Sequence, residues 1–314
     1  MSANSAIEWT EATWNPVRGC TKVSPGCKNC YAETFAERWR GIPGHPFEQG
    51  FDLRLVPEKL DQPLRWKRGR RIFVNSMADL FHEGVPFEYI AAVFGVMAAC
   101  PQHTFQVLTK RPARMLEFFE WVARRAEHGL AMFPDDPPEW RIHQMLNVAA
   151  RKLGAEAPSH HGGEWPLANG HLGVSTEDQE TADKRIPLLW QCPAAVRWVS
   201  AEPLRGPLDL FMVDDDGGWG PGWRLTHYQQ TTDYGTGVEH GVDAQVALDW
   251  VVIGAESGPG RRACEVEWIA SLVAQCKGVE VPCFVKQDTG PRPGDRGRLS
   301  DELWAIKELP AVRP

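Results

Sequence analysis

The sequence predicts an α/β protein folded as a partial or full (β/α) barrel, similar to a TIM barrel, with two insertions. Segments that favour strands alternate with segments that favour helices, which is typical of parallel βα units. Six or seven such units fit into 314 residues, which favours a barrel over an open sheet. Hydrophobic residues make up 43% and charged residues 24% of the chain, so a hydrophobic core of ordinary size is expected.

The first expected elements surround a short loop that is rich in cysteine. Residues 13–19 are predicted to form a strand-like lead into this loop. A helix is expected over residues 31–39, because aromatic residues recur there at every fourth position. Glycine and proline at 41–50 indicate a loop, and the apolar run at 71–75 indicates the next strand.

The remaining elements follow the same alternation along the chain. Apolar runs bounded by polar residues indicate the strands, and apolar faces with helical spacing indicate the helices. Further strands are predicted at residues 104–109, 172–175, 195–200, 250–254 and 281–285, and helices at residues 87–100, 112–126, 181–190, 265–276 and 300–309.

Two stretches interrupt this alternation and are predicted to be insertions into a single domain that covers residues 1–314. Residues 127–169 contain closely spaced prolines, histidines and glycines, with a candidate helix inside, and residues 213–247 are rich in glycine, aspartate and threonine. Long irregular segments in compact domains are usually functional, so both are expected to act as lids or as surfaces for partners.

Charge and hydropathy limit the location of the protein and its partners. The chain holds no run of eighteen apolar residues and starts without a signal-peptide pattern, so we expect a cytoplasmic protein that does not span a membrane. A formal net charge of −7 argues against binding of nucleic acid over the whole surface. Residues 54–71 run against this average with seven basic side chains, which form either a solvated face or a patch that contacts phosphate.

Three of the eight cysteines are closely spaced and predict a metal centre. Cys20, Cys27 and Cys30 fall in a CX6CX2C pattern on a loop that also holds Pro25 and Gly26. Three soft thiolates at this spacing can converge on one soft metal centre. A 4Fe-4S cluster can accept three cysteines and keep one iron open for a substrate or a cofactor. The other five cysteines are scattered and are expected to be small buried hydrophobic residues.

Zinc is the alternative metal, and it predicts a different kind of protein. A structural zinc site needs four closed ligands, usually in two separated pairs, and no second CXXC pair occurs in the chain. His82 is the candidate fourth ligand, because it follows the strand expected at residues 71–75. A closed site would make the protein a non-catalytic iron–sulfur or zinc module that binds DNA or another protein. Three unligated cysteines are the remaining alternative.

Polar residues follow the predicted strands at their carboxyl ends, where the active sites of βα barrels lie. Together they predict a polar ligand site, although each residue alone is also typical of a helix cap. They include Asn75, Asp79, Lys110, Arg111, Ser175, Glu177, Ser200, Glu202 and Glu256. Without a cluster, Glu177 and Glu202 would instead suit the paired carboxylates of a hydrolase.

The cysteine loop resembles the start of a known group of radical S-adenosylmethionine (SAM) proteins. The stretch Asn15-Pro-Val-Arg-Gly-Cys20, followed by Cys27-Lys-Asn-Cys30-Tyr-Ala, is similar to the opening of the DNA repair photolyase-like proteins, which include spore photoproduct lyase. Outside the two insertions the chain resembles more closely an uncharacterised family of radical-SAM-like proteins from phages and bacteria. That family shares the CX6CX2C loop and the stretches Gly-Val-Ser-x-Glu-Asp-Gln at 173–179 and Gly-Ala-Glu-Ser-Gly at 254–258.

This resemblance implies a barrel of the radical SAM type that binds a 4Fe-4S cluster and SAM and receives electrons from a flavodoxin or ferredoxin. The implied substrate is a nucleic acid base or a nucleotide, in DNA repair or nucleic acid modification. Lys110 would pair with the methionine carboxylate of SAM, and Glu177 or Glu202 would accept hydrogen bonds from its ribose or amine. The implied SAM contacts are Tyr31, Asn75, Lys110, Ser175, Glu177, Ser200, Glu202 and Glu256.

Two features of the loop depart from the usual radical SAM pattern. The first gap is wider than in the common CX3CX2C spacing, and Asn29 stands where an aromatic residue usually precedes the last cysteine. Tyr31 follows that cysteine directly, so we expect its ring to supply the missing packing over SAM.

Overall fold

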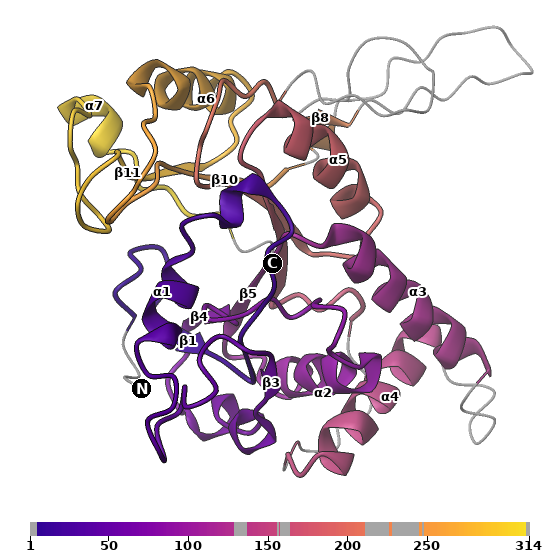
Figure 1. The fold of residues 1–314 in the computed structure, drawn as a ribbon. Helices are drawn as coiled ribbons and strands as arrows, with labels where there is room; N and C mark the ends of the chain where they lie inside the picture. The colour runs from indigo at the N-terminus through magenta and orange to yellow at the C-terminus, as the bar shows by residue number, and fades with distance from the viewer. Residues whose placement is uncertain are drawn as a thin grey trace, which may run out of the picture. The chain divides into compact units, whose positions relative to one another are not determined.

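The computed structural model describes residues 5–128, 137–155, 157, 164–210, 226–227, 245–246 and 248–311 (Figure 1). The chain divides into two compact units. The first unit comprises residues 1–175 with 191–196 and 313–314, and the second comprises residues 176–190 and 197–312. Each unit contains parallel strands together with helices that connect them.

The first unit is a parallel sheet with helices between its strands. The strand order is β1-β4-β5-β6, and each pair of neighbours is parallel. The strands are β1 (Ala12–Trp14), β4 (Arg71–Val74), β5 (Thr104–Thr109) and β6 (Gly170–Ser175), and the helices are α1 (Tyr31–Glu37), α2 (Phe87–Ala98), α3 (Pro112–His128) and α4 (Pro138–Lys152). Strand order follows chain order, as expected for consecutive βα units.

The two faces of this sheet differ in polarity. The register places one set of buried apolar side chains on a single face, where each large one contributes about 1.5–3 kcal/mol by burial. This apolar face consists of Ala12, Trp14, Ile72, Val74, Phe105, Val107, Leu172 and Val174. On the opposite face, one residue from each of the four strands lies beside the next across the sheet. These residues are Thr13, Phe73, Gln106 and His171. Three of these four residues are polar, and Phe73, Gln106 and His171 are buried, so protein also covers this face. Trp9 contributes to the cover, since its ring packs on Phe73 and its carbonyl accepts from Gln106 Nε2.

The strand expected at 13–19 is wrong in extent, because the chain breaks at Pro16. The segment after it forms β2 (Val17–Arg18), which pairs antiparallel with β3 (Arg54–Leu55). Proline has no N–H group and cannot continue the hydrogen bonding of β1. The N–H of Val17 instead donates to Asn75 Oδ1 at 3.1 Å, which turns the chain away from the sheet.

Helix α4 lies in the stretch that the sequence predicts as the first insertion, and it packs on α2. Gly95 of α2 permits this contact, because a Cβ atom there would collide with the backbone carbonyl of Leu146. Leu146 and Ala150 of α4 are fully buried, so the candidate helix inside 127–169 belongs to the core of the first unit. The other predictions for the two insertions fall mainly on residues outside the described ones, namely 129–136, 156, 158–163, 211–225, 228–244 and 247.

The second unit has a three-stranded parallel sheet in the order β7-β10-β11. Its strands are β7 (Val196–Ala201), β10 (Trp250–Gly254) and β11 (Cys283–Gln287), and its helices are α5 (Gln179–Trp190), α6 (Val266–Gly278) and α7 (Asp301–Trp304). A separate antiparallel pair consists of β8 (Thr226–His227) and β9 (Gln245–Val246). Every residue of β10 is buried, as its continuous apolar sequence predicts.

The helix predicted at 300–309 is wrong in length, because α7 ends at Trp304. Beyond it the chain pairs with the edge strand β11. The N–H of Val285 donates to the Ile306 carbonyl, and the N–H of Glu308 donates to the Cys283 carbonyl, both at 3.0 Å. Backbone pairing with an exposed sheet edge therefore replaces the last turns of the expected helix.

The α/β class and the parallel βα units are confirmed, and the strand orders are compatible with a partial barrel. Among the helices of the described residues, none combines the length and the apolar character that a membrane crossing requires.

Candidate functional site

Cys20, Cys27 and Cys30 lie between β2 and α1 in the first unit, on a segment that we call the cysteine loop. Gly19 opens the loop with a φ of +77°, and a Cβ atom there would collide with the facing backbone, so glycine is required. Cys27 ends the short 3-10 helix η1 (Pro25–Cys27), and Cys30 immediately precedes α1. The three thiols are partly exposed, whereas the five scattered cysteines are buried, as the sequence predicts.

The residues before the first cysteine hold the loop by contacts with other segments of the first unit. Asn15 Oδ1 accepts from the Met77 N–H at 3.0 Å, and Arg18 Nη1 donates to the Pro46 carbonyl at 2.8 Å. The Arg18 guanidinium also lies over the ring of Phe47, 5.3 Å from its centroid. The Asn-Pro-Val-Arg-Gly stretch therefore orders the entry to the cysteine loop.

Two of the three thiols share an apolar environment. Cys20 and Cys30 both pack against a small apolar cluster that consists of Ala32, Ala36, Phe47 and Phe51. Burial raises the pKa of the Cys20 thiol to about 11 and also raises the pKa of the Cys30 thiol. The charge of Cys27 adds to the rise in pKa at both thiols. The three thiols thus belong to one short loop and influence one another electrostatically.

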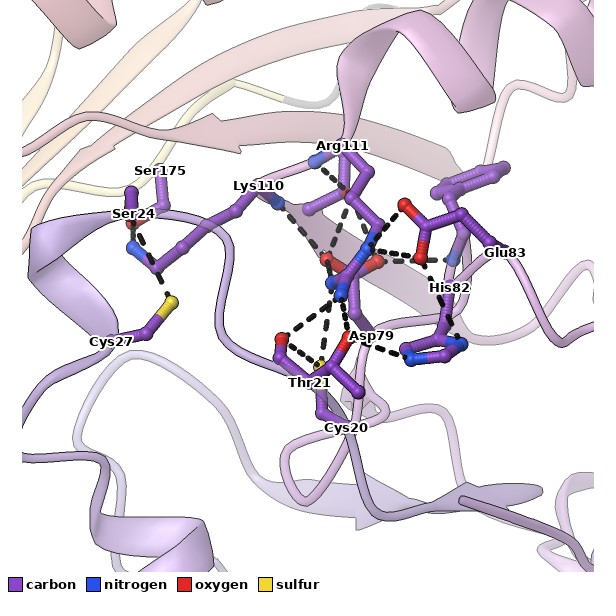
Figure 2. Close-up of polar contacts among 12 residues, drawn as sticks. Cys20, Thr21, Ser24, Cys27, Asp79, His82, Glu83, Lys110, Arg111 and Ser175 are labelled. Carbon is purple, nitrogen blue, oxygen red and sulfur yellow. Dashed lines mark hydrogen bonds and ion pairs between the residues drawn. The ribbon is translucent and has the colours of Figure 1, made fainter. Parts of the chain in front are cut away.

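Arg111, which follows β5, connects the cysteine loop to the segment after β4 (Figure 2). Its Nη1 donates to Cys20 Sγ at 3.3 Å, and its Nη2 donates to the Thr21 carbonyl at 2.9 Å. Nη1 also donates to Asp79 Oδ2 at 3.1 Å, and Nε donates to the Glu83 carboxylate at 3.1 Å. The Arg111 side chain is only 4% exposed, so these partners compensate a buried positive charge.

Asp79 is the buried partner of this guanidinium. Its carboxylate also accepts from Thr109 Oγ1 at 2.8 Å, from the Lys110 N–H at 3.1 Å and from the Phe81 N–H at 3.0 Å. Hydrogen bonds to an ionised acceptor are roughly twice as strong as neutral ones. Asp79 therefore fixes the turn after β4 against the end of β5 and orients Arg111 toward the cysteine loop.

His82 does not fit the role of a fourth zinc ligand. Its Nδ1 accepts from the Gly84 N–H at 3.0 Å, and its Nε2 shares a hydrogen bond of 3.0 Å with Thr21 Oγ1. Both ring nitrogens are therefore occupied. Burial lowers the pKa of His82, and the charge of the nearby Arg111 guanidinium lowers it further, so the ring is neutral at pH 7.

The cysteine loop offers three thiols as candidate metal ligands. Within the described ranges, no group of three or more His, Cys, Asp or Glu side chains is arranged to hold one metal ion. Zinc requires four ligands around one ion, and His82 does not complete that set. In a 4Fe-4S cluster each thiolate binds a different iron atom, so the three sulfurs are spread around a larger body. Three partly exposed thiols on one loop suit such a cluster with one open iron.

Four of the predicted SAM contacts belong to the first unit and lie near the carboxyl ends of its strands. The Tyr31 hydroxyl donates to the carbonyl of Ser76, just after β4, while its ring remains exposed. Asn75 has a φ of 59°, and its buried Nδ2 has no hydrogen-bond partner among the described residues. Lys110 Nζ donates to Ser175 Oγ at 2.5 Å (Figure 2). The structure thus provides a cation and an unpaired buried donor beside the strand ends.

The other predicted contacts, Ser200 and three glutamates, belong to the second unit, where each carboxylate pairs with a basic side chain. The pairs are Glu177 with Arg185 at 3.2 Å, Glu202 with Lys286 at 2.8 Å and Glu256 with Arg262 at 2.5 Å. Ser200 Oγ donates to Glu202 Oε2 at 3.2 Å. Glu177 and Glu202, which would suit the paired carboxylates of a hydrolase, are therefore each bound to a different basic side chain.

The basic run at residues 54–71 does not adjoin the cysteine loop through β4. It enters β4 at the amino end of that strand, whereas Asn75 and Asp79 follow the carboxyl end. Within the run, Arg70 lies over the Trp66 ring at 5.2 Å, and Arg65 pairs with Asp61 at 2.8 Å. The start of the run lies elsewhere, because Arg54 and Leu55 form β3 and pair with Arg18 and Val17, just before the cysteine loop.

Asp79, Arg111 and Thr21 complete the site. The sequence places Asp79 and Arg111 among the polar residues that follow its strands, although not among the SAM contacts, and the structure has Asp79 five residues after β4 and Arg111 two residues after β5. The ends of adjacent parallel strands lie about 4.8 Å apart, so a carboxylate and a guanidinium there can pair. Thr21 offered no signal beyond its place next to Cys20.

His171, on the polar face of the first sheet, gives the protein a predicted loss of stability in acid. Burial lowers its pKa to about 4. An unfolded histidine titrates near pH 6.5, so between these values the unfolded chain binds more protons, and the free energy of unfolding falls as the pH falls. The full effect is about 3 kcal/mol below pH 4. Urea unfolding between pH 7.5 and 4.5 should show a smaller loss for His171→Gln, and identical slopes for the two proteins would contradict the assignment.

Comparison with known proteins identifies the family of the chain. No curated protein and no solved structure matches it. A family model described as a protein of unknown function, DUF5131, matches residues 4–299 and so includes the cysteine loop and most of both units. The chain therefore belongs to the DUF5131 family.

Proposed function

We propose that the protein is an iron–sulfur enzyme of the radical SAM type, with a 4Fe-4S cluster held by Cys20, Cys27 and Cys30. One observation carries this proposal: three partly exposed thiols share one loop, while the other cysteines are buried. Their number leaves one iron of a cluster without a protein ligand, as the chemistry of SAM requires. When bound, the reduced cluster and SAM supply a 5′-deoxyadenosyl radical that abstracts hydrogen from a substrate.

The residues of the first unit have distinct tasks in this proposal. The three cysteines hold the cluster as thiolates, and the Arg111 guanidinium favours the ionised form of Cys20 by charge and by a hydrogen bond. Lys110, held by Ser175, would pair with the carboxylate of SAM. Asn75 Nδ2 would donate to an acceptor atom of the ligand, which would satisfy a buried donor that is otherwise unpaired.

Fewer observations support a SAM contact for Tyr31 and for the residues of the second unit. Tyr31 is 59% exposed and directly follows Cys30, so its ring would pack on a ligand of the cluster. Ser200, Glu177, Glu202 and Glu256 already have protein partners, and a role toward SAM would require them to share or exchange these partners. A nucleic acid base or nucleotide as substrate, a flavodoxin or ferredoxin as electron donor and a cytoplasmic location rest on the resemblance and on sequence patterns.

The proposal is tested by the metal content of the full chain. The protein is purified without oxygen, reconstituted with iron and sulfide, and analysed for iron, sulfide and zinc. We expect about four iron and four sulfide per chain, the composition of one 4Fe-4S cluster. Stoichiometric zinc without iron would contradict the proposal and would favour a metal-stabilised binding module.

A further inference from the structure

A buried guanidinium, that of Arg111, joins the cysteine loop to the rest of the first unit. Arg111 is held on one side by the carboxylates of Asp79 and Glu83 and points Nη1 at Cys20 Sγ, 3.3 Å away (Figure 2). Nη2 fixes the next residue through both the carbonyl and the hydroxyl of Thr21, at 2.9 and 3.0 Å. The guanidinium thus binds the sulfur and the backbone beside it at once.

The two carboxylates that neutralise this guanidinium differ in exposure. The Asp79 side chain is 9% exposed, whereas the Glu83 side chain is 64% exposed. Asp79 therefore orients Arg111 in a site of low dielectric, and Glu83 adds a partly screened negative charge on the outer side. A change at Glu83 can alter the charge that Cys20 experiences without removing a buried group.

Charge and hydrogen bonds at a ligand sulfur affect the redox chemistry of a cluster in a known direction. Reduction adds one electron, and the extra negative charge is spread partly over the thiolate sulfurs. A positive donor at such a sulfur stabilises the reduced state more than the oxidised state, so it raises the reduction potential. The effect is strong where the donor is buried, because solvent screens it little.

We infer that Arg111 is a positioning residue that holds Cys20 and raises the reduction potential of the cluster, with Glu83 as a moderating charge. This inference rests on the proposed function, since it requires a 4Fe-4S cluster on the cysteine loop. It assigns Arg111 no contact with a substrate. Its role is to make delivery of one electron from a biological donor easier and to keep the first ligand in place.

The test is a redox titration of the reconstituted full chain with dithionite, followed by EPR at low ionic strength. Arg111→Met should shift the midpoint potential to a lower value, because a donor and a positive charge are lost. Glu83→Gln should shift it in the opposite direction by a smaller amount, because a negative charge is lost. Arg114→Met is the matched control, since Arg114 lies on α3 over the ring of Phe87 and should leave the potential unchanged.

The experiment distinguishes failure of this inference from failure of the proposed function. The iron content of the wild type is measured first, and its absence would remove the proposed function. A cluster whose potential is equal in the wild type, Arg111→Met and Glu83→Gln would remove only this inference. If Arg111→Met does not fold, Glu83→Gln decides alone: an upward shift supports the inference, and an unmoved potential overturns it.

Discussion

Alanine in place of Cys20, Cys27 or Cys30 is expected to abolish the cluster, whichever of the three is changed. In the proposed cluster each thiolate would bind a different iron atom, and no fourth cysteine among the described residues is exposed enough to replace a lost one. Iron per chain after reconstitution should therefore fall from about four to near zero, together with the visible absorbance of the cluster.

Cys100→Ala is the matched control for this series. Cys100 belongs to the first unit and is fully buried, and burial raises the pKa of its thiol to about 12, so it has no role as a ligand. This variant should retain the iron content of the wild type. Retention of iron by any of the three loop variants, or its loss from Cys100→Ala, would contradict the assignment of the ligands.

Asp79→Ala is expected to destabilise the first unit by about 3–5 kcal/mol, the usual cost of removing one partner from a buried ion pair. The substitution would leave the Arg111 guanidinium buried without its main counter-charge. It would also leave Thr109 Oγ1 and two backbone N–H groups without their acceptor. Urea unfolding of the protein without its cluster measures the effect, so that cluster loss does not contribute.

Two further variants show whether charge is the cause. Glu83→Gln removes the exposed partner of the same guanidinium and should cost only about 0–1 kcal/mol. The double variant Asp79→Ala with Arg111→Met removes the unpaired charge as well, so it should be more stable than Asp79→Ala alone. A double variant that is less stable than Asp79→Ala would show that packing, rather than the unpaired charge, accounts for the loss.

The parts of the fold that the sequence could predict are those in which local pattern and burial agree. The continuous apolar run of β10 is an example, since every residue of that strand is buried. In α1 the helix is confirmed but its aromatic residues, Tyr31 and Phe35, are exposed. The errors lie where a distant segment competes with the local pattern. Asn75 accepts the N–H of Val17 and ends the first strand early, and β11 pairs with residues that the sequence assigns to a last helix.

The sequence could predict those parts of the candidate site whose residues lie close together along the chain. The spacing of the three cysteines indicates a soft metal centre without any knowledge of the fold. Asp79 and Arg111, which support the cysteine loop, lie far apart in the sequence. Their pairing depends on the direction in which side chains point after the ends of two neighbouring strands, and the sequence does not show that direction. For the same reason the sequence could not show that Lys286 compensates Glu202, or that both nitrogens of His82 are occupied.

An open iron on the proposed cluster would bind SAM, and EPR of the reduced protein with and without SAM detects such binding. We expect a reduced 4Fe-4S signal whose g-values shift when SAM is added, and a weaker response in Lys110→Met, which lacks the cation for the SAM carboxylate. A 4Fe-4S signal that is identical with and without SAM would contradict the proposal, because it would mean a cluster that is closed to SAM.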